Sequence, residues 1–559
     1  MKKYQNPILV IIFLVCLLFP RFSQIERPIT VDELTWLTFS SDFLFGIASG
    51  ELEHTYQDHH PGVTTMAAGT AAYALEDRSY RAVGEFVEND TFKLIDLLGA
   101  EGFSIFDVLV TARQIMALAS SAALLASLWF LWRIWGAFPA WVTMIFVILD
   151  PMVIGQTRLY SHEGLMSSLI LLAWLSFYHY LTQGQRWSSL LLSGIVMGLA
   201  ALTKISALGL VPLIGLALLF NVFVSEFNDP AEKKLSWSKI KSILVPFGIW
   251  FLVVCLVFIA LWPATWANPW KTMIKLIEHT MGFIDSGNLS TSANVSSPSL
   301  LEGIGAYLHS IWAHPTLIVW FGNLIALLAL IFKRRWKTPA FLTEMNVYAY
   351  GYIVILVGAI GGLSSFRADR YMTSAHVLLA FLAGAGVLIL IEWLKQLPWF
   401  EKRTWVSWLV VAILIVAQIV TILPAKPYYY VYLNPLAGNP WWGVHGAFLD
   451  QAADYLAEKP EAESSTVMLF SPGSFMFYYP GDVHYIISKP GWTDSDVRKL
   501  EDSDYLVINF ELANLNQAPR IIAEISDVEP EYTISFQGRE YVWVYPVEDL
   551  PASVFVPDP

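Results

Sequence analysis

The sequence contains eleven apolar runs, each long enough to cross the roughly 30 Å hydrocarbon core of a bilayer as a helix. A soluble fold cannot bury so many runs, and the composition agrees, with 55% apolar and only 14% charged residues. The sequence therefore predicts a polytopic α-helical membrane protein. The expected spans cover residues 7–22, 107–133, 138–156, 161–182, 187–204, 206–224, 243–262, 312–332, 346–363, 371–393 and 404–424.

Basic residues between the runs indicate the orientation, because short cytoplasmic loops collect Lys and Arg. With the N-terminus inside, every inner loop carries such residues. They are Lys2, Lys3, Arg133, Arg186 and the basic residues of 232–241, 333–337 and 401–403. The first run could also be a signal peptide, but "PRFSQIERP" after it offers no small-residue cleavage site. We expect a retained helix, a cytoplasmic N-terminus and a plasma (inner) membrane location.

This orientation leaves three long segments outside: residues 23–106, residues 263–311 and the tail after the last run. Within the first, residues 61–75 are too short and too mildly apolar to span, and we interpret them as an interfacial helix. Residues 441–559 carry 20 acidic and 6 basic residues and contain strand-like pieces such as "DYLVINF". We expect a transmembrane domain over 1–425 and a small extracytoplasmic α/β domain over 426–559, which supports acceptor binding or stability without a catalytic base.

Polar residues that do not belong in an apolar span gather at the outer edge of this arrangement. Taken singly, each could cap a helix or contact headgroups, but their convergence on one face favours a site. The candidates are Asp32 and Glu33 after the first run, His59 and His60 in "YQDHHPG", Arg158, His162 and Glu163 around a turn, Lys204 in "LTKIS", and Arg367, Arg370 and Tyr371 in "FRADRYM".

The order of these motifs resembles the GT-C glycosyltransferases. An acidic pair follows the first span, a His-Pro element lies later in the same loop, "TK" ends an outer helix, and "RY" opens a late one. The similarity is greatest to the protein O-mannosyltransferase and aminoarabinose transferase group, and "YYYVYLNPLAGNPWWGVHGAFLDQAADYL" (428–456) is similar to the junction segment of bacterial members. The family often has Pro-Pro where this chain has "HHPG", and Arg-Tyr-x-x-Pro where it has "RYMTSA". The resemblance implies a polyprenyl-phosphate sugar donor.

The chemistry of such a transfer suits the same residues. A carboxylate can take the proton of an acceptor hydroxyl or amine, which makes Asp32 the expected general base, with Glu33 as its neighbour or substitute. Cations stabilise the departing lipid phosphate, and we expect Lys204, Arg367 and Arg370, with Tyr371, at the donor phosphate. His59, His60, Arg158, His162 and Glu163 are expected to contact substrate. A single carboxylate base predicts direct displacement with inversion at the sugar carbon.

The sequence leaves other functions open. A lipid-linked oligosaccharide transferase or ligase has a similar architecture, and a membrane transporter also holds charges among its helices. We expect no cofactor, although His54, Asp58 and His59 have a spacing that leaves a divalent metal open. The expected partners are the lipid donor, the bilayer and an acceptor that is a protein, lipid or glycan; no nucleic acid is expected.

Overall fold

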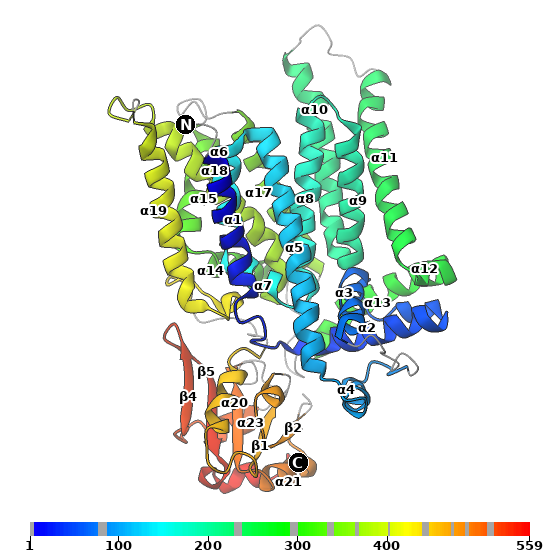
Figure 1. Cartoon of the computed structure of the whole chain (residues 1–559), viewed down its shortest axis with the longest axis vertical. Helices are drawn as coiled ribbons and strands as arrows, with labels where there is room; N and C mark the ends of the chain where they lie inside the picture. The colour runs from blue at the N-terminus through cyan, green and yellow to red at the C-terminus, as the bar shows by residue number, and fades with distance from the viewer. Residues whose placement is uncertain are drawn as a thin grey trace.

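The computed structural model describes residues 5–76, 86–228, 237–290, 300–332, 340–363, 368–400, 403–438, 446–470, 474–486, 491–510 and 519–558. Helices form a tall bundle, and a small domain with a β-sheet lies beyond one of its ends (Figure 1). Helix α1 starts at the opposite end of the bundle. The chain is thus a multi-pass helical membrane protein with a small C-terminal sheet domain, as the sequence predicts.

Seven segments of the described chain are long and apolar enough to cross a membrane. They lie in α5 (Ile105–Trp135), α8 (His162–Thr182), η3 (Ile205–Gly209) with α10 (Leu210–Asn228), α11 (Trp237–Leu261), α17 (Ala340–Leu363), η5 (Asp369–Met372) with α18 (Thr373–Leu394), and α19 (Thr404–Ile422) with η6 (Leu423–Ala425). Helices α1 (Gln5–Phe22) and α9 (Trp187–Thr203) are apolar but shorter. Every run that we expected to span is therefore helical, although not all are full-length spans.

Two of the expected spans are broken rather than straight. The run 138–156 falls on α6 (Ala137–Ile148) and α7 (Pro151–Arg158), and the angle between these two helices is 68°. The run 312–332 covers the end of α14 (Leu300–Ala313) and all of α15 (Leu317–Ile331), which are bent by 110° relative to each other. Each break contains a proline, which has no N–H and disfavours helix at the residue before it. Counting each bent pair as one span gives nine spans among the described residues.

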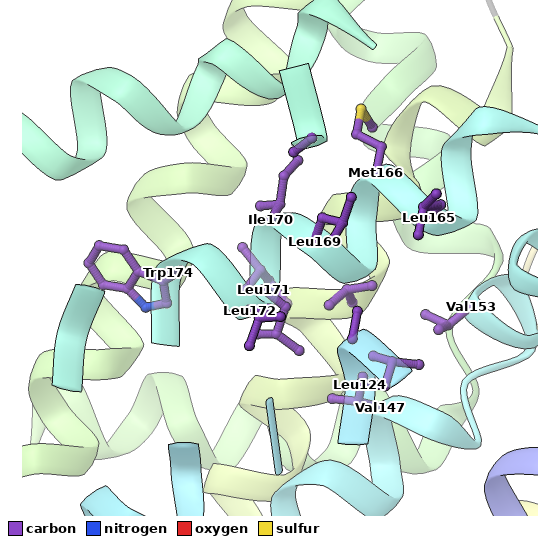
Figure 2. Packing of buried hydrophobic residues seen from close by; sticks show 14 of the residues in the cluster. Leu124, Val147, Val153, Leu165, Met166, Leu169, Ile170, Leu171, Leu172 and Trp174 are labelled. Atoms are coloured by element: carbon purple, nitrogen blue, oxygen red, sulfur yellow. The ribbon is translucent and has the colours of Figure 1, made fainter. Parts of the chain in front are cut away.

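Helices α8 and α18 form the centre of the bundle. In their apolar windows, 94% and 78% of the residues are buried, against 17% for α11 at the periphery. Figure 2 shows α8 residues from Leu165 to Trp174 packed near Leu124, Val147 and Val153 of neighbouring helices. Between α15 and α18 the backbones touch, because a Cβ built on Gly386 would lie 1.9 Å from the Gly322 carbonyl oxygen.

The segment after α1 folds into helices at the end of the bundle near the sheet domain (Figure 1). They are α2 (Val31–Ser49), η1 (Leu52–Thr55), α3 (Val63–Glu76) and α4 (Thr91–Ala100). The predicted helix over 61–75 is present as α3, and it packs against α2 with the Tyr73 hydroxyl donating to the Leu37 carbonyl at 3.1 Å. The sequence analysis missed α2. Figure 1 shows α2 lying across the vertical helices, beside α12 (Ala264–Ala267) and α13 (Pro269–Ser290).

The C-terminal domain contains one five-stranded mixed sheet in the order β2-β1-β3-β5-β4. Strands β1–β3 pair in parallel, and β5 pairs antiparallel with β3 and β4. The strands are β1 (Thr466–Phe470), β2 (Asp482–Ile486), β3 (Tyr505–Asn509), β4 (Tyr532–Phe536) and β5 (Arg539–Pro546), with helices α20 (Leu449–Ala457), α21 (Asp494–Glu501) and α23 (Pro519–Glu524).

Arg27 and Glu26 join this domain to the segment between α1 and α2. The Arg27 guanidinium donates to both carboxylate oxygens of Asp454 and lies over the Tyr478 ring, with 4.4 Å to its centroid. The Tyr478 hydroxyl donates to the Glu26 carbonyl at 2.7 Å. The carboxylates of Asp454 and, at 3.9 Å, of Asp450 therefore pair with Arg27 at this junction.

Candidate active site

The sequence "TVDE" at residues 30–33 starts α2 and fixes the direction of its two acids. Thr30 and Glu33 form a capping box, in which the Thr30 backbone N–H donates to Glu33 Oε2 at 2.7 Å. Because Glu33 turns back toward the cap, it is fully buried, whereas the Asp32 side chain is 38% exposed. The two adjacent acids thus occupy different environments.

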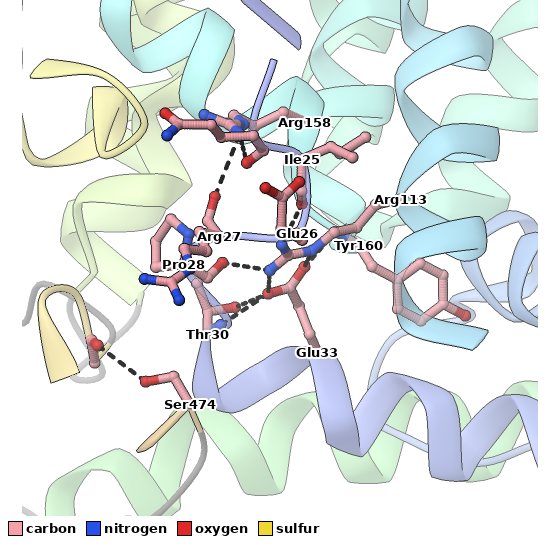
Figure 3. A network of polar contacts seen from close by, with 12 residues as sticks. Ile25, Glu26, Arg27, Pro28, Thr30, Glu33, Arg113, Arg158, Tyr160 and Ser474 are labelled. Carbon is pink, nitrogen blue, oxygen red and sulfur yellow. Dashed lines mark hydrogen bonds and ion pairs between the residues drawn. The ribbon is translucent and has the colours of Figure 1, made fainter. Parts of the chain in front are cut away.

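Glu33 belongs to a buried ion-pair network rather than to an open site (Figure 3). Its carboxylate accepts from Arg113 Nε at 2.7 Å and Nη2 at 2.5 Å, and from the Tyr160 backbone N–H at 2.7 Å. Arg113 also donates to the carbonyls of Ile25 and Pro28. With its oxygens occupied by these donors and by Thr30, Glu33 is poorly placed to take an acceptor's proton. These contacts favour a structural role for Glu33, and its expected role as a substitute for Asp32 stays a prediction.

Asp32 faces one of the predicted cations. Its Oδ2 lies 3.0 Å from Arg370 Nη2. Arg370 is in η5, the turn before α18, and its guanidinium lies 5.5 Å from the Tyr371 ring centroid. The structure therefore brings the acid after the first apolar helix together with "RY", as the sequence analysis expected.

Lys204 lies on the other side of Tyr371. Its Nζ is 4.0 Å from the Tyr371 ring centroid and 2.5 Å from Glu163 Oε1, and both charged side chains are buried. Glu163 is in the first turn of α8, where the helix dipole favours an anion, and His162 Nε2 lies 3.3 Å from the same oxygen. The ends of α8 and α9 thus supply a second charged pair next to the Asp32–Arg370 pair.

The "DHH" segment completes this row of polar residues. The rings of His60 and His162 are 5.3 Å apart, and those of His59 and His60 are 3.9 Å apart. Burial, with the charge of Lys204 adding to it, holds the pKa of His60 well below its ordinary value. Burial acts to raise the pKa of Asp58, but the hydrogen bond to His59 Nδ1 at 2.5 Å, the charges of His59 and His162 and the His59 backbone N–H together lower that pKa.

We call this continuous set of contacts the polar row. It contains Asp32, Asp58, His59, His60, His162, Glu163, Lys204, Arg370 and Tyr371. It combines an accessible carboxylate, two cations and several histidines at one end of the bundle. Such a set can accept a proton at one point and neutralise an anion at the next.

Besides Glu33, two predicted site residues are not part of the polar row. Arg158 is buried and donates to the carbonyls of Pro427, Ser23 and Arg27, at 2.7, 2.9 and 3.2 Å (Figure 3 shows its position). It therefore holds the chain segments at the domain junction, and its expected contact with substrate stays a prediction. Arg367 lies outside the described residues.

The three residues whose spacing left a metal open, His54, Asp58 and His59, do not lie in one cluster. His54 Nε2 lies 3.1 Å from Glu51 Oε2, and its ring packs on Phe86, whereas Asp58 pairs with His59. The turn η1 ends at Thr55, so His54 and Asp58 do not share a helical face. Within the described part of the chain, no three His, Cys, Asp or Glu side chains are grouped so as to hold a metal ion.

The sequence analysis missed several residues that build the site. Trp36 packs edge-on against His162, with ring centroids 5.0 Å apart, and the Tyr160 hydroxyl lies 2.6 Å from Ser40 Oγ. Arg113, the partner of Glu33, was also missed because it lies inside an apolar run. The Thr-x-x-Glu spacing of "TVDE" is a capping signature that could have identified both α2 and the role of Glu33.

Comparisons with known proteins agree with this arrangement. The family model of dolichyl-phosphate-mannose-protein mannosyltransferases matches residues 89–275, which include His162, Glu163 and Lys204. No curated protein sequence matches significantly.

Similar solved structures include ArnT of Cupriavidus metallidurans bound to undecaprenyl phosphate (13% identity, 98% of this chain and 99% of that chain, TM-score 0.45). They also include the oligosaccharyltransferase AglB of Archaeoglobus fulgidus with an inhibitory peptide and a dolichol-phosphate (11% identity, 91% and 70%, TM-score 0.44). The match to the dolichyl-phosphate-mannose-protein mannosyltransferase family thus covers about a third of the chain, and that part includes three residues of the polar row.

Proposed function

We propose that the chain transfers a sugar from a polyprenyl-phosphate donor to a hydroxyl or amine acceptor on the extracytoplasmic face of the membrane, with inversion at the sugar carbon. The observation that carries this proposal is the 3.0 Å contact between Asp32 and Arg370. In a displacement with inversion, the base and the cation at the departing phosphate lie on opposite faces of the sugar carbon. The ion pair supports the proposal because it brings a proton acceptor and a cation suited to phosphate to one location, where a bound sugar would separate them.

Asp32 acts as the general base in this mechanism. As the acceptor oxygen or nitrogen bonds to the anomeric carbon, its proton passes to the Asp32 carboxylate and the bond from that carbon to the phosphate oxygen breaks. The lipid phosphate leaves with the bonding electrons, and Lys204 and Arg370 neutralise its charge. Glu163 holds Lys204 in position, since it pairs with the lysine at 2.5 Å.

The orientation of the bundle supports an extracytoplasmic site. The polar row lies at the end where α2 and the sheet domain are found, and α1 starts at the opposite end (Figure 1). Arg133 ends α5 and Arg186 precedes α9, where short loops turn back toward the site. These basic residues favour a cytoplasmic location for the end opposite the polar row.

The direct test is a transfer assay with purified protein and a panel of polyprenyl-phosphate sugars, in which release of the lipid phosphate and the configuration of the new bond are measured by NMR. We expect transfer from a monophosphate donor with inversion. A product of retained configuration would contradict a single-carboxylate mechanism. Transfer from pyrophosphate-linked oligosaccharides alone would favour an oligosaccharide transferase instead.

A further inference from the structure

A buried histidine connects the broken span to the turn that carries Arg370. His314 lies in the break between α14 and α15, and its side chain is 6% exposed. Its Nδ1 lies 2.9 Å from the Tyr432 carbonyl oxygen, and its Nε2 lies 3.3 Å from Asp369 Oδ2. Asp369 directly precedes Arg370 in η5. One imidazole thus contacts both the donor-side turn and the segment that leads to the sheet domain.

The two contacts together constrain the protons of this pair. A carbonyl oxygen only accepts, so the hydrogen bond to Tyr432 requires a proton on Nδ1 of His314. If His314 were neutral with that proton, the lone pair of Nε2 would face the Asp369 carboxylate, and the contact would be repulsive. The 3.3 Å contact between Nε2 and Asp369 Oδ2 is an ion pair when His314 carries a proton on both ring nitrogens.

This contact is one of those that connect a short turn to the rest of the bundle, in addition to the Arg370–Asp32 ion pair and the contact of Tyr371 with Lys204. Within η5, the Tyr371 backbone N–H donates to the Ala368 carbonyl at 3.1 Å, and Thr373 Oγ1 donates to the Arg370 carbonyl at 2.5 Å. Both of these bonds are local and move with the turn. The Asp369–His314 contact instead connects the turn to a distant helix break.

We infer that His314 is a positioning residue: through Asp369 it holds the turn so that Arg370 faces Asp32 and the donor phosphate. This inference rests on the proposed role of Arg370. The break itself is held by Asn434, whose side chain donates to the carbonyls of Trp312 and Ala313 at 2.7 and 3.0 Å. His314 is therefore fixed at its own end and can transmit that position to Asp369.

Other titratable groups surround the pair. The His376 ring of α18 lies 5.6 Å from the His314 ring, and Asp150, at the break between α6 and α7, interacts electrostatically with His314. Neither group directly precedes a residue of the polar row. Asp369 is therefore the partner through which His314 can affect Arg370.

A double-mutant cycle tests the inference, with undecaprenyl phosphate as the binding probe and purified His314→Ala, Arg370→Ala and double variants. His314→Ala should weaken probe binding by about 3- to 10-fold, less than Arg370→Ala, because the cation remains but is misdirected. In the Arg370→Ala background, His314→Ala should add almost nothing, and the acceptor KM should not change. His314→Gln, which keeps an N–H facing Asp369, should recover part of the affinity. Independent effects that multiply in the double variant would overturn the inference.

The controls separate this inference from the proposed function. His179→Ala removes another buried histidine, bonded to Ser189 at 2.9 Å near the cytoplasmic end, and should leave probe binding unchanged. If Arg370→Ala binds the probe normally, the proposed function fails. If Arg370→Ala is impaired and His314→Ala is not, only the positioning role fails. Should His314→Ala not fold, Asp369→Asn takes its place in the cycle with Arg370→Ala. Independent effects of Asp369→Asn and Arg370→Ala on probe binding would overturn the inference equally.

Discussion

The Asp32 carboxylate lies 3.0 Å from the Arg370 guanidinium, although one residue follows the first apolar helix and the other precedes the last but one. In the proposed function this pair serves proton removal and phosphate binding. The Asp32 side chain is partly exposed, whereas Glu163 and Lys204 are buried. The predictions below depend on this difference in exposure.

Asp32→Asn should lower sugar transfer by roughly 10² to 10⁴-fold while binding of the lipid phosphate persists, because the amide keeps the shape but cannot take a proton. Turnover and probe affinity of the purified variant, with folding checked by thermal unfolding, measure this. Asp90→Asn is a matched control, since Asp90 caps α4 in the same outer segment and Asn is an equally good cap. Normal turnover in folded Asp32→Asn would remove Asp32 from the mechanism.

The two cations should respond differently to removal. Arg370→Ala should weaken binding of the lipid phosphate with little loss of stability, because Asp32 is partly exposed and stays solvated. Lys204→Met should weaken binding and also destabilise the fold by about 3 to 5 kcal/mol, because Glu163 is left buried without its charged partner. Thermal unfolding and probe titration measure both effects. Adding Glu163→Gln to Lys204→Met should restore stability without restoring binding; equal melting temperatures for the two single variants would contradict this account.

Glu33→Gln should act on stability rather than on chemistry. The substitution leaves Arg113 buried without its anion, so the variant should lose about 3 to 5 kcal/mol of stability. The molecules that remain folded should still transfer sugar, because the base is Asp32. Activity per folded protein at a temperature below the lowered transition measures this. A stable but inactive Glu33→Gln protein would return Glu33 to the list of candidate bases.

Stability should fall with acid below about pH 6.5, and His60 should contribute to that fall. Its pKa is well below the ordinary value in the folded protein, mainly through burial, so the unfolded chain binds the extra proton first. The contribution of His60 to stability is therefore fully present above the pKa that this residue has in the unfolded chain. It is lost as the pH falls toward the lower pKa that His60 has in the folded protein. Melting temperatures between pH 7.5 and 5 should drop less steeply in His60→Gln. Parallel curves for the two proteins would show that His60 is not involved.

The orientation can be tested with reporters that are active on one side of the membrane. Fusions near residues 230 and 450 should report opposite sides, with the first cytoplasmic and the second exported, as the basic loops predict. The assay needs no knowledge of the sugar or acceptor. Reporters on the same side would contradict both the orientation and the extracytoplasmic site.

Local sequence pattern accounts well for the helices and the sheet domain. Apolar runs must become helices in a bilayer, because every backbone group there needs an internal partner, and the strand-like pieces "STVMLF", "DYLVINF" and "REYVWVYP" contain β1, β3 and β5. The two bent spans were not predicted, because hydropathy responds to composition and is insensitive to a single proline. Asp150 and Thr316, which cap α7 and α15 at these breaks, were visible but not used.

The sequence by itself determined that this chain crosses a membrane repeatedly and carries a set of acids, cations and histidines at one edge, because hydropathy and charge are properties of the residues alone. Only the tertiary structure decided which of them act together. Adjacent Asp32 and Glu33 are equivalent in sequence, but the first turn of α2 directs one toward Arg370 and buries the other against Arg113. His314 and Asp369 come together for the same reason: a contact between residues far apart in the chain depends on how the helices pack, and no local pattern contains that information.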